Sequence, residues 1–243
     1  MRIRSALIAA LSLIAQLSAC QSEAPAAASG PSGFANDIEI FADWDARNAT
    51  PADPIVFAGS SSIRLWNTAE RFRGLPVVNR GFGGSQMADV NTYVKETVLK
   101  YSPRIVVLYA GENDIDAGRT NDELFAAYET FVRAVHGADS TADIIFLPIK
   151  PSLKRWALWT RMRDVNERVR VYAKANANAR LHSIDLASPM LGADGKPRPE
   201  LFVEDGLHMT PVGYDGWTSA LRPLLDSLSA RPRHAIARVA AVP

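Results

Sequence analysis

The sequence predicts a three-layer α/β/α fold, in which helices cover both faces of a parallel sheet of about five strands. Three observations support this fold class. Short runs of residues are apolar throughout, as in strands buried on both faces. Segments with helical periodicity alternate with those runs along the chain. Polar clusters follow several of the runs, at the edge of the sheet where α/β proteins bind their ligands.

Five apolar runs are candidate strands. The first and third of them read PIVFA and IVVLYA. Runs of this length, without alternating polar positions, are typical of parallel strands whose two faces are both covered. The candidate strands are residues 54–58, 75–78, 105–110, 144–147 and 181–186.

Segments with an apolar residue every three or four positions precede the first run and separate later ones. Several of them begin with a residue that caps a helix or with a proline suited to the first turn. The predicted helices are residues 34–44, residues 87–98 with Ser85 as cap, residues 124–135 behind the capping box Thr120-x-x-Glu123, residues 165–172, and residues 214–228 with Thr210 as cap and Pro211 in the first turn. Each helix has one apolar face to pack on the sheet, which completes the predicted layers.

The composition fits one globular domain. The 243 residues are 47% hydrophobic and 22% charged, with a formal net charge of +1. Such a chain has no basic field for nucleic acid or for an acidic membrane surface, so we expect neither as an electrostatic partner. No histidine or cysteine cluster has the spacing of a metal site, and we expect no metal and no cofactor.

The N-terminus has the features of a bacterial export signal. Arg2 and Arg4 precede an apolar stretch, residues 6–17, that is shorter than the roughly 20 residues needed to span a bilayer. The stretch ends in Leu-Ser-Ala-Cys and resembles the lipobox of bacterial lipoproteins. The resemblance implies a signal peptide at residues 1–19 and a lipid on Cys20. The alternative is cleavage after the A-x-A-type run at residues 26–28, with Cys20 unmodified.

Gln21, rather than aspartate, follows the cysteine. In the resemblance to Gram-negative lipoproteins this implies the cell envelope, on the periplasmic face of the outer membrane, with the lipid anchor as the contact with the membrane. Residues 20–33 are rich in alanine, serine, proline and glycine and are expected to form a flexible tether. We expect one folded domain at residues 34–229 and a disordered tail at residues 230–243.

Four polar clusters lie where the sheet rule places a functional site. They read GSSS at residues 59–62, NRGFGG at 79–84, GEND at 111–114 and DGLH at 205–208. Each alone has a commoner structural interpretation, as a helix cap, a tight turn or a structural histidine. The glycine-rich cluster is not G-x-G-x-x-G and has no P-loop lysine, which disfavours nucleotide binding. Together, the four clusters indicate one active site.

With these clusters the chain resembles the SGNH hydrolases, the GDSL-type esterases and lipases, from about residue 34 to 228. The four blocks of that family supply a serine, a glycine, an asparagine and a histidine, which match Ser61, Gly84, Asn113 and His208. Asp205 precedes the histidine with the spacing of the family, Asp-x-x-His. The resemblance implies a flavodoxin-like fold and a serine hydrolase that cleaves carboxylic esters through an acyl-enzyme intermediate.

The resemblance also implies a role for each matched residue. Ser61, His208 and Asp205 form the catalytic triad. The backbone N–H groups of Ser61 and Gly84 and the side-chain amide of Asn113 form the oxyanion hole. The family usually has aspartate before the nucleophile, where this chain has a second serine, so Ser60 and Ser62 are alternative nucleophiles. The G-x-S-x-G elbow of other α/β hydrolases does not fit, because it would need glycine at position 63.

These residue types suit acyl transfer. A serine hydroxyl needs a base within about 3 Å, and a histidine, which titrates near pH 6.5 in water, can take and return the proton. An aspartate accepts from the other ring nitrogen and stabilises the imidazolium. Loss of one oxyanion donor typically costs a factor of about 10²–10³ in turnover, so we expect that loss in Asn113→Ala.

Substrate identity is not predicted beyond an ester with a short acyl group, carried by a small molecule, a lipid or a glycan. Two other functions remain open: an envelope O-acyltransferase that passes the acyl group to a sugar or peptidoglycan hydroxyl, and a glycan-binding module without catalysis. Trp156 and Trp159 either line the pocket or pack a helix on the sheet.

Overall fold

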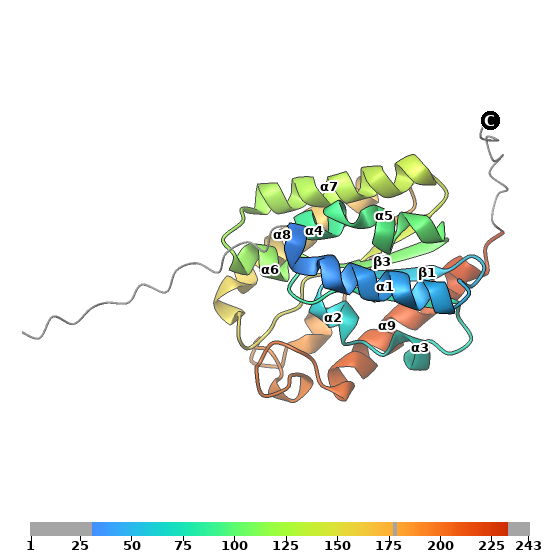
Figure 1. Cartoon of the computed structure of the whole chain (residues 1–243). Coiled ribbons are helices and arrows are strands. Elements are labelled where there is room, and N and C mark those ends of the chain that lie inside the picture. The colour runs from blue at the N-terminus through green and yellow to red at the C-terminus, as the bar shows by residue number, and fades with distance from the viewer. Residues whose placement is uncertain (1–30, 177–178, 233–243) are drawn as a thin grey trace, which may run out of the picture.

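The computed structural model describes residues 31–176 and 179–232, which form a layered α/β structure (Figure 1). The signal peptide expected at residues 1–19, the lipidation site Cys20 and the alternative cleavage site at residues 26–28 lie outside these residues. Residues 233–243 of the expected tail lie outside them as well. Residues 31–33, which we expected to belong to a flexible tether, form most of a 3-10 helix, Pro31–Phe34.

The described residues contain one parallel sheet of five strands in the order β2-β1-β3-β4-β5. This confirms the predicted fold class and all five candidate strands. The fifth strand ends at Ser183 rather than residue 186. The chain moves from β1 to one edge and then crosses to the other side, so the strand order switches between β1 and β3. The strands are β1 (Ile55–Gly59), β2 (Val77–Gly81), β3 (Ile105–Tyr109), β4 (Asp143–Phe146) and β5 (Leu181–Ser183).

Helices cover both faces of the sheet (Figure 1). The α-helices are α1 (Ala35–Arg47), α2 (Ser61–Arg64), α3 (Thr68–Arg71), α4 (Met87–Thr92), α5 (Val94–Thr97), α6 (Glu112–Asp116), α7 (Asn121–Ala138), α8 (Trp159–Ala175) and α9 (Pro211–Ser229). Helices α4, α5, α7 and α8 pack on one face, whereas α9 packs on the other with the short α2 and α3 beside it. No helix in the described part of the chain is both long enough and apolar enough to cross a membrane.

Each strand contributes to two cores because successive side chains point to opposite faces. In β1, Val56 and Ala58 face the α4–α8 side, and Ile55 and Phe57 face α9. On the α9 side, Trp217 packs against Tyr109 and the other aromatic rings of that core. Burial of each such side chain contributes about 1.5–3 kcal/mol to folding. The two cores bury β1 and β3 on both faces and so place the segments that follow them at one end of the sheet.

The helix predicted at residues 87–98 differs from the expectation in two ways. Its cap is Gln86, whose N–H donates to the Asp89 carboxylate at 2.8 Å, so the prediction of Ser85 as cap was wrong. Ser85 instead donates its hydroxyl to the Phe82 carbonyl at 3.0 Å. The segment is also split into α4 and α5 at Tyr93. The reason is local, because threonine hydroxyls in this segment bond back to carbonyls one turn earlier, which bends helices.

The other predicted start signals behave as expected. The Thr120 hydroxyl accepts from the N–H of Glu123, and the Glu123 carboxylate accepts from the N–H of Thr120, which completes the capping box of α7. The Thr210 hydroxyl accepts from the N–H of Gly213, with Pro211 in the first turn of α9. This cap fixes the point at which α9 begins, directly after the polar cluster at residues 205–208.

Candidate active site

The turn after β1 brings three serines to the end of the sheet. Gly59 ends the strand with φ +132°, a conformation that favours glycine. A Cβ at this position would lie 1.9 Å from the carbonyl oxygen of Tyr109 on the neighbouring strand. The close approach of β1 to β3 therefore requires glycine at this position. The turn that follows Gly59 makes Ser61 the first residue of α2.

Ser61, His208 and Asp205 form one chain of hydrogen bonds. Ser61 Oγ lies 2.9 Å from His208 Nε2, and His208 Nδ1 lies 2.6 Å from Asp205 Oδ2. A carboxylate only accepts, so Nδ1 carries the proton and the neutral ring accepts the Ser61 hydroxyl proton at Nε2. The three residues thus have the arrangement of a nucleophile, a base and a group that orients the base.

Asp205 also shapes the loop that carries the histidine. Its Oδ1 accepts from the backbone N–H of Leu207 at 2.8 Å and of His208 at 2.9 Å. Desolvation raises the pKa of Asp205, but these backbone bonds and the His208 ring outweigh it and lower the pKa to about 2. The carboxylate is therefore ionised at neutral pH.

The neighbouring serines have different surroundings. Ser62 is 2% exposed and its hydroxyl accepts from Lys150 Nζ at 3.3 Å. Ser60 is 3% exposed and precedes α2 as its capping residue. Of the three serines, Ser61 is the one whose hydroxyl contacts His208.

Three groups are available to bind a negative oxygen. The backbone N–H groups of Ser61 and Gly84 donate to no acceptor in the described part of the chain. Gly84 has φ +82°, and a Cβ there would meet open space, so its backbone is accessible. Asn113 Nδ2 donates to the Ser85 carbonyl at 3.0 Å, and Asn113 Oδ1 accepts from Arg155 Nη1 at 3.0 Å. The first of these bonds joins the loop after β2 to the segment after β3, so the segments that carry Gly84 and Asn113 are linked at this end of the sheet.

A buried ion pair that sequence reasoning missed lies beside this edge. The side chain of Lys150 is fully buried and pairs with Glu112 Oε2. Lys150 Nζ also donates to Tyr109 OH at 3.2 Å and to Ser62 Oγ at 3.3 Å. Ser152 Oγ donates to Glu112 Oε1 at 3.1 Å. We call Lys150, Glu112, Tyr109, Ser62 and Ser152 the buried network. It joins the loops that follow β1, β3 and β4.

The sequence contained one signal of this network. Lys150 stands in the run LPIKP directly after the fourth candidate strand, where a charged residue has to be buried with a partner. Burial lowers the pKa of Lys150, and the Glu112 carboxylate opposes that effect. Burial also raises the pKa of Tyr109 well above its ordinary value, with Glu112 acting in the same direction.

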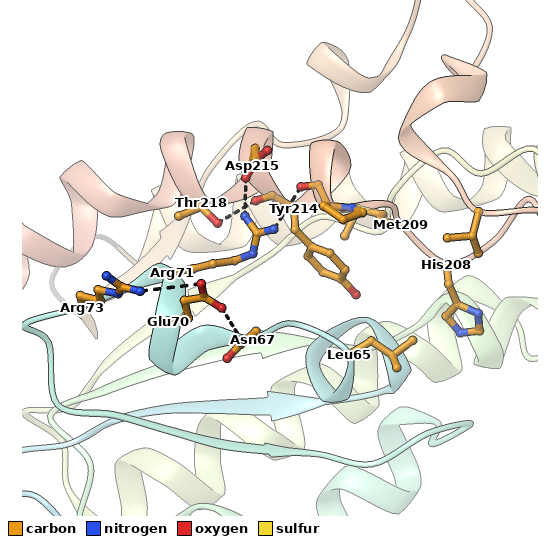
Figure 2. Close-up of a pocket in the computed structure, with 12 residues that line it drawn as sticks. Leu65, Asn67, Glu70, Arg71, Arg73, His208, Met209, Tyr214, Asp215 and Thr218 are labelled. Carbon is orange, nitrogen blue, oxygen red and sulfur yellow. Dashed lines mark hydrogen bonds and ion pairs between the residues drawn. The ribbon is translucent and has the colours of Figure 1, made fainter.

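An open cleft of about 950 Å³ begins at His208. It runs from His208 and Leu65 at one end to Glu70 and Arg73 at the other, between α3 and the start of α9 (Figure 2). Its lining is Leu65, Asn67, Glu70, Arg71, Arg73, Val203, His208, Met209, Pro211, Tyr214, Asp215 and Thr218. Charged and amide side chains therefore line most of its far end, and apolar side chains lie near the histidine.

Trp156 and Trp159 do not line this cleft. Their rings stack on each other with centroids 6.1 Å apart, at the start of α8. Trp159 borders a separate pocket of about 460 Å³ between α8 and the segment after β5. Among the described residues, no group of three or more His, Cys, Asp or Glu side chains is placed to hold a metal ion.

Comparison with known proteins identifies the family and the fold. Residues 59–215 match the model of the GDSL-like Lipase/Acylhydrolase family. No curated protein matches the chain. A GDSL-like lipase from Bacteroides thetaiotaomicron is 22% identical, with a TM-score of 0.67, and the match covers 78% of this chain and 97% of that one.

Two further solved structures share the fold. A protein from Streptococcus pneumonia described as a putative platelet activating factor is 19% identical over 78% of this chain and 91% of that one, with a TM-score of 0.70. An acetylxylan esterase from Geobacillus stearothermophilus is 15% identical over 74% of this chain and 95% of that one, with a TM-score of 0.60.

Proposed function

The chain belongs to the GDSL-like lipase/acylhydrolase family and is a carboxylic ester hydrolase, and from that premise we propose that it removes short acyl groups from polar alcohols through an acyl-enzyme on Ser61. The observation that carries the assignment of residues is the continuous chain of hydrogen bonds from Ser61 through His208 to Asp205.

The first half of the proposed reaction forms the acyl-enzyme. Ser61 Oγ attacks the ester carbonyl carbon while His208 Nε2 takes the hydroxyl proton. The imidazolium that results faces the Asp205 carboxylate, which stabilises it. The carbonyl oxygen becomes an oxyanion and accepts from the N–H groups of Ser61 and Gly84 and from the amide of Asn113. The intermediate then collapses, and His208 returns its proton to the alcohol that leaves.

The second half releases the acid. A water molecule attacks the acyl carbon and gives a proton to His208, and a second tetrahedral intermediate forms at the same donors. Collapse of this intermediate breaks the bond to Ser61 Oγ, which takes the proton back from His208. The carboxylic acid leaves and the starting arrangement is restored.

The cleft supports a polar alcohol as the leaving group. Because His208 protonates the leaving oxygen, the alcohol departs on the side of the molecule where the cleft begins. The far end of the cleft presents the Arg73 guanidinium, the Glu70 carboxylate and the Asn67 amide, which suit hydroxyl groups better than an alkyl chain. Solved acetyl esterases of the same fold, among them the acetylxylan esterase, support an acetyl or other short acyl group.

The test is hydrolysis of p-nitrophenyl esters of increasing acyl length, followed by acetylated sugars. We expect activity to fall as the acyl chain lengthens and to be lost in Ser61→Ala. Reaction with a labelled fluorophosphonate separates the enzyme from a binding module, which would not be labelled. Product analysis with a free sugar acceptor separates hydrolysis, which yields the acid, from acyl transfer, which yields a new ester. A folded chain that neither hydrolyses these esters nor reacts with the probe would contradict the proposal.

We also propose export and lipid attachment at Cys20. Support comes from the sequence alone: an apolar segment that ends in Leu-Ser-Ala-Cys, followed by glutamine. Metabolic labelling with a fatty acid is expected to mark the wild-type chain but not Cys20→Ser. Fatty-acid label on Cys20→Ser would contradict lipid attachment at Cys20, as would a mature N-terminus that begins after residue 28.

A further inference from the structure

We propose that Arg155 is a positioning residue, which holds the amide of Asn113 with its N–H side toward the reacting ester. The inference rests on the proposed function, in which Asn113 is a donor to the oxyanion. It assigns a role to a residue outside the five that the sequence singled out for catalysis. Three features of the structure carry it.

The first feature is the environment of the Asn113 amide. The two ends of an asparagine amide have nearly the same shape, so its orientation is decided by its partners. Here Oδ1 accepts from Arg155 Nη1 at 3.0 Å, and Nδ2 donates to the Ser85 carbonyl at 3.0 Å. One Nδ2 proton is directed to Ser85, and the second has no acceptor among the residues that the structure describes, which leaves it for a ligand.

The second feature is that a guanidinium only donates and a carbonyl only accepts. A flipped amide would face the Arg155 guanidinium with its own N–H groups and would face the Ser85 carbonyl with its oxygen. Both contacts would be repulsive, and the flipped amide would offer the substrate no donor. Arg155 therefore selects the single orientation in which Asn113 serves as an oxyanion donor. Its positive charge also polarises the amide and strengthens the Nδ2–H group as a donor.

The third feature is that Arg155 is itself held in place. Its side chain is 11% exposed. Nη2 donates to Asp116 Oδ2 at 2.7 Å, and Nη1 lies 4.0 Å from Glu112 Oε1. Glu112 and Asp116 begin and end α6, the helix that carries Asn113, so the guanidinium lies along the whole of that short helix.

The segment that carries Arg155 is anchored as well. It follows β4 and includes Lys150 and Ser152, both of which contact Glu112. This attachment brings Arg155 to α6 with little freedom of movement. We infer that the segment after β4, which contributes no member of the catalytic triad, orients the oxyanion hole.

The experiment is a double-mutant cycle on p-nitrophenyl acetate, with Arg155→Met, Asn113→Ala and the double variant. Methionine keeps much of the volume of the arginine stem and removes the Nη1 and Nη2 groups that donate to Asn113 and Asp116. In the wild-type background we expect Arg155→Met to lower kcat by about 10–100-fold, the range that applies when a residue that orients a metal ligand is lost. The KM is expected to change by less than about threefold, because the oxyanion forms only in the transition state.

The cycle distinguishes positioning from a general structural role. In the Asn113→Ala background, Arg155→Met is expected to lower kcat by less than about threefold, since its target is already absent. Arg155→Lys, which keeps one charged donor, is expected to recover part of the lost kcat. Arg161→Met is the matched control: Arg161 bonds to the backbone of Ile115 and Arg119 nearby but not to Asn113, and its kcat should stay within about twofold of wild type.

Equal losses of kcat from Arg155→Met in both backgrounds would overturn the inference, as would an unchanged kcat in the wild-type background. Should Arg155→Met not fold, Arg155→Lys and Asp116→Asn take its place in the cycle, with the same criterion. Fluorophosphonate labelling and hydrolysis by the wild-type chain are measured alongside. Their absence contradicts the proposed function, whereas an active wild type with an additive cycle contradicts only the role of Arg155.

Discussion

Ser61 and Ser62 are adjacent in the chain and belong to two polar networks of opposite character. Ser61 contacts His208, whose side chain is 28% exposed, and through it Asp205, which is 40% exposed. Ser62 contacts Lys150, whose side chain is fully buried beside Glu112. One turn of chain thus joins a site open to solvent and substrate to an ion pair from which water is excluded.

The comparison shows how the molecule divides positioning from chemistry. In the proposed mechanism the exposed network exchanges protons with substrate and water, and hydrogen bonds to the Asp205 carboxylate outweigh its desolvation. The buried network holds its charges in a medium where an unpaired ion is costly, so it resists any movement that separates the partners. The segments after β1, β3 and β4 meet at the buried network, and two of these segments carry Ser61 and Asn113.

The largest expected difference between the two networks is in catalysis. Ser61→Ala should lower kcat/KM by about 10⁴–10⁶, because it removes the proposed nucleophile. Ser62→Ala, the matched control, should stay within about threefold of wild type, since its hydroxyl faces Lys150 rather than His208. Hydrolysis of p-nitrophenyl acetate measures both. The reverse result would move the nucleophile to Ser62 and would contradict the assignment of the exposed network.

For the free energy of unfolding we expect the reverse: a substitution in the buried network should have the larger effect. Lys150→Met leaves Glu112 charged, buried and without its main partner, and should lower the free energy of unfolding by about 3–5 kcal/mol. Adding Glu112→Gln should restore part of that loss. Lys154→Met, an exposed position four residues along the chain, is the control and should change stability by less than about 0.5 kcal/mol. Urea unfolding measures all of these variants, and a stable Lys150→Met would show that the pair contributes little.

The pH dependence of stability should also separate a buried carboxylate from an exposed one. Burial raises the pKa of Asp114 to about 6, although the N–H of Met87 donates to it at 3.0 Å. Below about pH 4 the group is protonated in both folded and unfolded chains, so it costs nothing there. Between about pH 4 and 6 the unfolded chain ionises this group while the folded chain keeps it protonated, so stability falls by up to about 3 kcal/mol and then levels off above pH 6.

The Asn variant of this position lacks that titration. Asp114→Asn should therefore be as stable as the wild type near pH 4 and more stable than it at pH 7.5, with the change centred between pH 4 and 6. Urea unfolding at several pH values tests this. A constant difference across that range would show that Asp114 does not titrate there.

Asp205 should show the opposite sign and a smaller effect. Its pKa is lowered to about 2 by the hydrogen bonds described above, so the stability that it provides is present above about pH 4 and is lost as pH falls toward 2. Because the group is exposed, Asp205→Asn should cost less than about 1 kcal/mol at pH 6. Thermal unfolding from pH 2 to 6 tests the sign: a difference that grows toward low pH would contradict it.

The fold could be predicted from the sequence because its signals are local. A run such as IVVLYA has no polar position to face solvent, and Thr120 with Glu123 marks a helix start within one turn. The grouping of Ser61, His208 and Asp205 could also be predicted, but only through the family resemblance. Nothing in the residues around Ser61 indicates that a histidine 147 positions away will contact it.

The remainder of the site depends on contacts that sequence patterns do not show. The apolar run before Lys150 signals its burial, but its partner Glu112 is apparent only when β3 and β4 lie side by side. Arg155 stands 42 positions from Asn113 and is not marked by any motif. The break between α4 and α5 was missed because the apolar stripe at residues 87–98 continues through it, whereas the bend comes from side-chain bonds to the backbone.

The positions of the proposed triad residues along the chain have a consequence for synthesis of the protein. The proposed base, His208, lies three residues after Asp205, whereas the proposed nucleophile, Ser61, precedes it by 147 residues. At a synthesis rate of about 5–20 residues per second, a ribosome needs on the order of ten seconds to reach the histidine after it has passed the serine. Throughout that interval the nascent chain carries an ordinary, unreactive hydroxyl. On the proposed assignment, hydrolysis therefore starts only after residues 205–208 have been synthesised and have folded against Ser61.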